Sequence, residues 1–111
     1  MLVLIGDIQA QIPRRAELEA AMLAAQSDAR EQDGCISFSF AAAVGEPGHF
    51  LVVERWRDRA AMEAHFRSPS FVAYQAAITG LLARDTELRV YTVTDASLPV
   101  DSSGLDLAND E

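Results

Sequence analysis

Runs of hydrophobic and polar residues along the first 94 positions predict six elements of secondary structure. Four short runs, in which apolar side chains alternate with polar ones or are nearly continuous, are typical of β-strands. They cover residues 2–10, 35–44, 50–57 and 86–94. Between them, apolar residues recur every three or four positions over 13–34 and 59–82, which indicates helices. The predicted order is strand, helix, strand, strand, helix, strand.

Residues with strong capping preferences mark the ends of the predicted helices. Pro13 suits the first turn of a helix, and Gly34 is a typical C-terminal stop. Asp58 is a good N-cap, and Ser68 with Pro69 begins a new helix because serine caps it and proline fits its first position. The second helix is therefore predicted in two parts.

Apolar stripes show which faces of the helices should be buried. The first helix carries Leu18, Met22, Ala25 and Ala29 at helical spacing, and the last one carries Phe71, Gln75, Ile78 and Leu82. We expect both stripes to pack on the sheet.

Alternation assigns the faces of the two middle strands, which the Gly-Glu-Pro-Gly turn at 45–48 joins as a hairpin. In the first of them Ile36, Phe38 and Phe40 share a face. In the second, Phe50, Val52, Glu54 and Trp56 share one face, and Leu51, Val53, Arg55 and Arg57 share the other.

Four antiparallel strands with helices on one face make an α+β fold, the ferredoxin-like β-α-β-β-α-β layout with a split second helix. The second face of this sheet is also apolar in places, at Leu51 and Val53 and, in the last strand, at Leu88 and Val90. Such a face needs a second layer. Packing sheet on sheet with a second copy is the simplest cover, so we expect a homodimer.

Composition narrows the class of protein. A chain of 111 residues, 50% hydrophobic and 23% charged, is one globular domain. Its net charge of −8 makes nucleic acid and anionic membranes poor partners. No apolar run is long enough to cross a membrane, and the start of the chain predicts a strand and no signal peptide, which favours the cytoplasm. Residues 95–111 form an acidic tail, either mobile or packed on a partner subunit.

Potential chemistry gathers between Gly34 and Phe71, and Tyr74 follows about one helical turn after Phe71. Glu54 and Trp56 face the same way on a strand, so the carboxyl should be partly desolvated and its pKa raised unless it is paired. The alternative is a core tryptophan and a glutamate paired with Arg89. His65 lies on an apolar helix face, where a histidine can exchange a proton near neutral pH or act only structurally. Tyr74 could bind a substrate oxygen or merely pack.

Other reactive groups favour no separate site. Cys35 has no neighbouring base and is an unlikely nucleophile, and His49 is expected in the solvent-exposed turn. No cluster of His, Cys, Asp or Glu has metal-ligand spacing.

Three short motifs in order carry a family resemblance: Asp33-Gly34-Cys35-Ile36, then Phe50-x-x-x-Glu54-x-Trp56-x-Asp58, then Ala64-His65-Phe66-x-Ser68. Together they resemble the antibiotic-biosynthesis monooxygenase family of dimeric α/β-barrel proteins, over about residues 1–94. The resemblance implies a cofactor-independent monooxygenase that oxidises a small quinol, anthrone or similar aromatic with O2. It implies His65 as base or proton shuttle, with Tyr74 and Glu54 orienting substrate oxygens. The ring would be held by Trp56, Phe50 and Phe71, beside Val52.

Two positions depart from branches of that family. The haem-degrading members carry a tryptophan at the position of His65 and the iron-ligating histidine at that of Gln75, and glutamine cannot replace imidazole on haem iron. Haem degradation is therefore disfavoured. Val52 stands where the anthrone oxygenases are expected to carry a polar residue, which argues against that chemistry. Two alternatives stay open, a non-catalytic small-molecule-binding dimer and a metabolite isomerase.

Overall fold

The computed structural model describes residues 1–97 and has the predicted α+β architecture. The elements follow the order β1 (Leu2–Gln9), a 3-10 turn η1 (Ile12–Arg14), α1 (Arg15–Arg30), β2 (Cys35–Ala42), β3 (His49–Trp56), α2 (Arg59–Phe66), α3 (Pro69–Ile78) and β4 (Glu87–Thr92). The ferredoxin-like order and the split second helix are thus confirmed. Residues 98–111, most of the predicted acidic tail, lie outside the described part of the chain.

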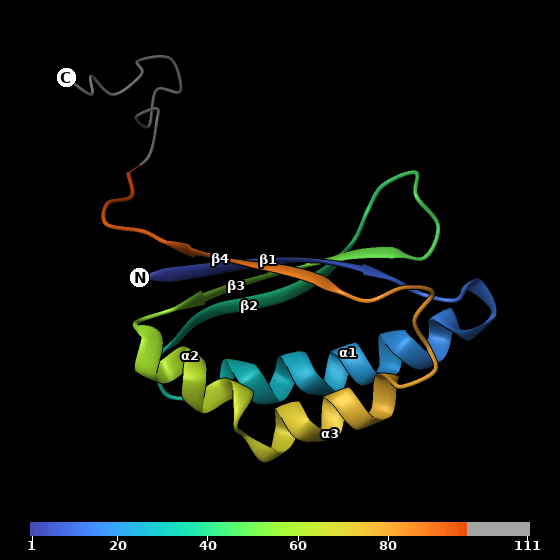
Figure 1. Ribbon diagram of the computed structural model, residues 1–111, viewed down its shortest axis with the longest axis horizontal. Coiled ribbons are helices and arrows are strands. Elements are labelled where there is room, and N and C mark those ends of the chain that lie inside the picture. Colours follow the sequence, from blue (N-terminus) through green and yellow to red (C-terminus); the bar gives the residue numbers. More distant parts are fainter. Residues whose placement is uncertain (98–111) are drawn as a thin grey trace.

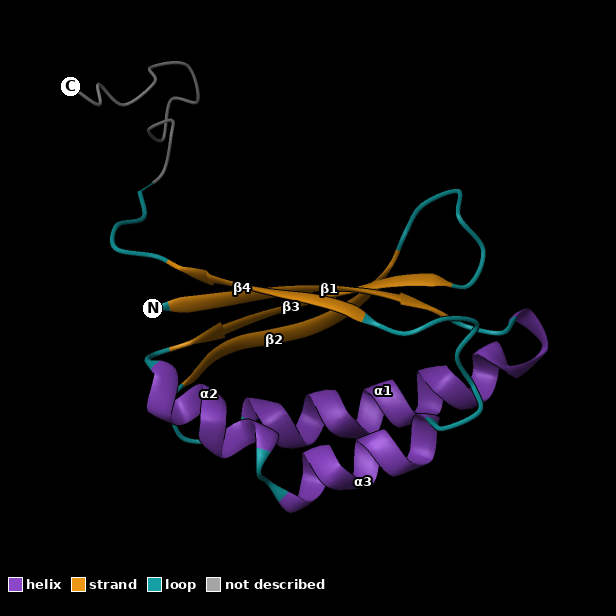
Figure 2. Ribbon diagram, in the orientation of Figure 1, coloured by secondary structure: helices purple, strands orange, loops and turns teal. Residues whose placement is uncertain are grey.

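The four strands form one antiparallel sheet in the order β2-β3-β1-β4. All three helices lie on one side of it, and the hairpin loop between β2 and β3 rises on the other side (Figures 1 and 2). The inner face, toward the helices, therefore holds the core, and the outer face has no second layer within residues 1–97.

The inner face follows from the strand registers. Leu2, Leu4, Gly6 and Ile8 of β1 are paired with Trp56, Glu54, Val52 and Phe50 of β3, and all eight are buried. From α1, the predicted stripe supplies Leu18, Met22 and Ala29 to the same core. The only polar or charged side chains buried among the described residues are Glu54 and His65.

Both predicted caps after β3 are present. The Asp58 carboxylate accepts a hydrogen bond from the backbone N–H of Ala61 at 2.9 Å, and the Ser68 hydroxyl accepts one from Phe71 at 3.2 Å. These caps fix where α2 and α3 begin, so they set the positions of the helical side chains that face the sheet.

Two helix limits differ from the sequence prediction. Pro13 lies in the 3-10 turn, and α1 begins only at Arg15. At the other end, α3 stops at Ile78, since Gly80 has a left-handed φ of 83° that ends the helix. Leu82 is therefore outside the helical stripe and pairs with Ala10 in an isolated bridge.

Three face assignments were also wrong. Ile36, expected beside Phe38, is 53% exposed, because a β-bulge between Cys35 and Ser37 adds a residue to β2. Leu88 and Val90 of β4 lie in register with Gly6 and Leu4, so they are on the inner face and not the outer one. They are exposed nevertheless, at the edge of the sheet.

The surroundings of His49 also differ from the prediction, which placed it in a solvent-exposed turn. It is the first residue of β3, and its side chain is only 15% exposed. Its ring nitrogens contact Asp7 at 2.9 Å and Glu46 at 3.0 Å, and these hydrogen bonds raise its pKa. It lies on the outer side of the sheet, away from the helices.

No helix among residues 1–97 is both long and apolar enough to span a membrane.

Candidate functional site

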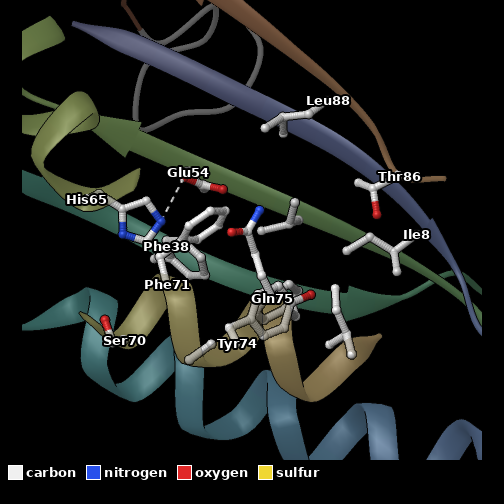
Figure 3. A pocket seen from close by; sticks show the side chains of 14 residues that line it. Ile8, Phe38, Glu54, His65, Ser70, Phe71, Tyr74, Gln75, Thr86 and Leu88 are labelled. Atoms are coloured by element: carbon white, nitrogen blue, oxygen red, sulfur yellow. Dashed lines mark ion pairs between the residues drawn. The ribbon is translucent and has the colours of Figure 1, made fainter. Parts of the chain in front are cut away.

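A cavity of about 240 Å³ lies between the inner face of the sheet and the helices. Its lining is mostly apolar and consists of Ile8, Ala25, Phe38, Phe40, Val52, Glu54, His65, Ser70, Phe71, Tyr74, Gln75, Ile78, Thr86 and Leu88. His65 and Glu54 lie at one end of the cavity, and Ile8 and Thr86 lie at the other (Figure 3). Gln75, Thr86 and Leu88 are exposed, so the cavity opens between α3 and β4. A concave, largely apolar space with a few polar groups is the usual form of a small-molecule site.

Glu54 projects from the inner face of β3 and is only 4% exposed. Its Oε1 accepts a hydrogen bond of 2.9 Å from the indole N–H of Trp56. Burial raises the pKa of Glu54 to about 7, and the Trp56 hydrogen bond opposes this rise only in part. The carboxyl can therefore give or take a proton near neutral pH. The alternative pairing with Arg89 is wrong, because Arg89 is in register with Ile5 on the outer face.

His65 projects from α2 into the same end of the cavity and is 4% exposed. Its Nδ1 lies 2.8 Å from Oε1 of Gln32. Its Nε2 is fully buried, has no hydrogen-bond partner among the described residues, and lies 4.0 Å from Oε1 of Glu54. Burial lowers the pKa of His65 to about 4, so the ring is neutral at neutral pH. The expectation that it titrates near neutrality is not met.

Aromatic rings surround His65 and continue along the helix side of the cavity. The His65 ring stacks on Trp56 with centroids 4.7 Å apart, and Phe38 and Phe71 meet it at 5.6 and 5.2 Å. Tyr74 follows one turn after Phe71 on α3, and its pKa is raised to about 12, first by burial and then by the charge of Glu54. Its phenol thus stays protonated and can donate a hydrogen bond.

The structure brings together most of the residues that the sequence singled out. Val52, Glu54, His65, Phe71 and Tyr74 all line the cavity. Two expected ring-holding residues do not, as the following contacts show.

Trp56 is fully buried behind His65 and contacts the site through that ring and through Glu54. Phe50 lies two register positions beyond Val52, under the guanidinium of Arg15 and beside a separate groove. Both side chains are on the inner face of β3, as alternation predicts. The strand is longer than the cavity, so residues near its two ends lie on the same face but do not line the cavity.

The cavity also includes four side chains that the sequence pattern does not assign to a small-molecule site: Ser70, Gln75, Thr86 and Leu88. The sequence could have placed Gln75 at the site, because a polar residue inside an apolar helical stripe faces the sheet. It could not have placed Thr86 and Leu88 there, because only the pairing of β4 with β1 brings them to the cavity. Of the lining drawn from residues 1–97, His65 is the sole basic side chain.

Metal binding has no support in the described part of the chain, where no group of three or more His, Cys, Asp or Glu side chains could hold an ion.

Comparison with known proteins extends these observations. A family model described as antibiotic biosynthesis monooxygenase matches residues 1–77. The uncharacterised protein sll1783 of Synechocystis is 32% identical over 94 residues, which are 85% of this chain but only 64% of that relative. The chain thus spans less than two thirds of that relative's length. Rv0793 of Mycobacterium tuberculosis, named as a presumed monooxygenase, is 31% identical over 73% of this chain and 79% of its own.

Two solved structures are similar to this chain over most of its length. The structure of Rv0793 has a TM-score of 0.81 and covers 87% of this chain and 98% of its own, at 27% identity. A protein of Deinococcus radiodurans, described as a presumed antibiotic biosynthesis monooxygenase, has a TM-score of 0.83 at 25% identity, covering 88% of this chain and 97% of its own.

Proposed function

The chain belongs to the antibiotic biosynthesis monooxygenase family, and from that premise we propose that it oxidises a small, neutral quinol or similar electron-rich phenol with O2. The observation that carries the proposal is the pair at the closed end of the cavity. A buried carboxyl with a pKa of about 7 stands 4.0 Å from an imidazole nitrogen that has no partner among the described residues.

Glu54 is the stronger base of that pair, since its pKa is about 7 and that of His65 about 4. A base is most effective when its pKa lies near the working pH. We therefore propose that Glu54 takes the proton from the phenol. His65 accepts a hydrogen bond from the substrate at Nε2. This revises the initial hypothesis, in which His65 was the base.

Oxidation needs no further electron source, because a deprotonated quinol can itself reduce O2. One oxygen atom forms a bond to a ring carbon, and the O–O bond then breaks. Protonated Glu54 returns a proton to the departing oxygen, which leaves as water. The ring carbon loses its hydrogen as a proton, which is the second proton of that water, and the product is a hydroxylated quinone. For each quinol and O2 consumed, one hydroxyquinone and one water form. Apolar walls that exclude water protect the reactive intermediate.

The charge of the cavity favours neutral substrates. Arg55, Arg57 and Arg67 are not among the lining residues, and Glu54 adds negative charge when ionised. A phosphorylated metabolite would need a cation there, which weakens the isomerase alternative. An anthrone remains within the proposal, although Val52 contributes no hydrogen bond to it.

Oxygen uptake tests the proposal directly. The protein is incubated in air with a panel of quinols and anthrones, and incorporation of isotopically labelled O2 into the product is followed by mass spectrometry. We expect Glu54→Gln to lower kcat by about 100-fold or more, which is the usual contribution of a proton-transfer group. Val72→Ala, on the exposed side of α3, should leave kcat unchanged.

The same assay distinguishes the non-catalytic alternative. A protein that only binds such compounds would show no labelled product, while ligands would still change the fluorescence of Trp56, the only tryptophan, through its stacking on His65. That result would refute the monooxygenase proposal.

The pH profile gives a second measurement. Glu54 must be ionised to accept the phenolic proton, so kcat/KM should rise as the pH increases through about 7. Glu54→Gln should lose this rise, whereas Tyr74→Phe should keep it with a lower kcat. A rise centred near pH 4 in the wild-type protein would instead point to His65 as the base.

A further inference from the structure

A closed chain of hydrogen bonds links the backbone carbonyl of His65 to the ring of the same residue. The Ser68 hydroxyl donates to the carbonyl oxygen of His65 at 2.6 Å. Gln32, two residues after the end of α1, donates from Nε2 to Ser68 Oγ at 3.3 Å and to Ser70 Oγ at 3.0 Å. Oε1 of Gln32 then lies 2.8 Å from Nδ1 of His65.

Each step of this chain fixes the direction of the next. A backbone carbonyl can only accept, so the single proton of the Ser68 hydroxyl is committed to it. The oxygen of Ser68 can then only accept from Gln32, which must present its NH₂ group to the serines. The amide oxygen of Gln32 consequently faces His65, and because that oxygen carries no hydrogen, Nδ1 must be the donor.

The consequence is a defined tautomer of the neutral ring. With its one hydrogen on Nδ1, His65 carries a bare lone pair at Nε2, a fully buried atom at the Glu54 end of the cavity. Ionised Glu54 alone would favour the opposite arrangement, since an N–H on Nε2 would point toward its Oε1 4.0 Å away. The hydrogen bond to Gln32 therefore holds the ring in the tautomer that its acidic neighbour opposes.

We propose that Gln32 is a positioning residue that makes the site selective for ligands carrying an O–H or N–H group. A lone pair at Nε2 accepts a hydrogen bond from a phenol but repels the carbonyl oxygen of a quinone. The cavity should thus bind a quinol more tightly than the matching quinone, which has no O–H group. The selectivity for quinols rests on the proposed function, whereas the tautomer does not.

Nitrogen NMR of the protein without any ligand tests the tautomer. The chain has only two histidines, so His49→Asn leaves the signals of His65 alone. At neutral pH we expect the proton on Nδ1 in this background and a shift of the population toward Nε2–H in Gln32→Leu. Gln32→Glu restores an acceptor and should restore the Nδ1–H form. A wild-type ring with its proton on Nε2 would overturn the inference.

Ligand binding tests the selectivity. Under anaerobic conditions, the wild type should bind a quinol at least about tenfold more tightly than the matching quinone, as followed by Trp56 fluorescence, and Gln32→Leu should reduce this preference. Ser70→Ala, which removes one of the two serine partners, should weaken it less and serves if Gln32→Leu fails to fold. Equal affinity of the wild type for both forms would overturn the selectivity.

The two proposals fail separately. An Nδ1–H tautomer without oxidation of any quinol or anthrone contradicts the proposed function and leaves the role of Gln32 standing. If the protein oxidises a quinol while His65 carries its proton on Nε2, the proposed function stands and the proposed role of Gln32 is contradicted.

Discussion

At the scale of single residues, the buried pair Glu54 and His65 couples the chemistry of the site to the stability of the fold. Burial raises the pKa of Glu54 from 4.5 to about 7 and lowers the pKa of His65 from 6.5 to about 4. The raised pKa means that Glu54 stabilises the fold at low pH and that this contribution is lost as the pH rises toward 7. The lowered pKa means that the contribution of His65 is present above 6.5 and is lost as the pH falls toward 4. The two effects oppose each other between pH 4.5 and 6.5.

Replacing one residue of the pair should reveal how the other makes the free energy of unfolding depend on pH. Relative to the wild type, we expect the free energy of unfolding of Glu54→Gln to rise with pH between 4.5 and 6.5, and that of His65→Gln to fall. Each slope can reach about 1.4 kcal/mol per pH unit, the value for one proton. Urea unfolding at constant ionic strength measures both. Slopes of the same sign would contradict the assigned burial of one of the two groups.

The sequence could predict part of this chemistry. The shared face of Glu54 and Trp56 follows from alternation, and the raised pKa of Glu54 follows from that face. The depressed pKa of His65 could not be predicted, because it depends on the rings that three other elements bring around the imidazole. Nor could the link to Gln32, which lies 33 positions away in the chain.

At the scale of the elements, capping residues and alternation predicted most of the fold, and the misassignments have local causes. Asp58 and Ser68 begin their helices as expected, because a cap is a local signal. The bulge at Ile36 has no such signal, since alternation continues through it in the sequence while the backbone changes face. The position of β4 on the inner side of the cavity depends on its register with β1, which the sequence leaves open.

Gly6 illustrates how the sheet makes room for the cavity. It lies in β1 opposite Val52 of β3 and Leu88 of β4, and both of these line the cavity. A Cβ at Gly6 would lie 2.8 Å from Cγ1 of Val52 and 3.0 Å from Cδ1 of Leu88. A side chain at this position would therefore compete with its two neighbours for the same space.

We expect Gly6→Ala to lower the free energy of unfolding by about 1–3 kcal/mol, the usual cost of overpacking, because the stiff side chain of Val52 must shift. Val52→Ala in the same chain should relieve the contact, so the double variant should lose less stability than the sum of the single ones by about 0.5 kcal/mol or more. Thermal and urea unfolding of the four proteins give this cycle. If the stability losses of the two single variants simply add in the double variant, contact with Val52 is not the cause of the loss in Gly6→Ala.

At the scale of the whole molecule, the sheet has helices on one side only. Its outer face carries Ile5 and Val53, which are register partners and are each 39% exposed, and Tyr91, which is 46% exposed. Exposed apolar groups that adjoin one another on a sheet are typical of an interface. A second copy packed on this face would cover it by two-fold symmetry and would leave the cavity, on the opposite side of the sheet, open to substrate.

Val53→Glu tests this arrangement. Because two-fold symmetry places each substitution in the interface twice, the buried charges should raise the dissociation constant of the dimer by at least about 30-fold. The control is Val72→Glu, which adds the same charge at a 56% exposed position on α3 and should leave the dimer intact. Sedimentation equilibrium at micromolar concentrations measures both, and circular dichroism checks that each variant is folded. A wild-type protein that is monomeric under these conditions would show that the outer face is tolerated in water without a partner. The same monomer would still contain every residue of the cavity, so its activity would decide separately whether the proposed chemistry needs the dimer at all.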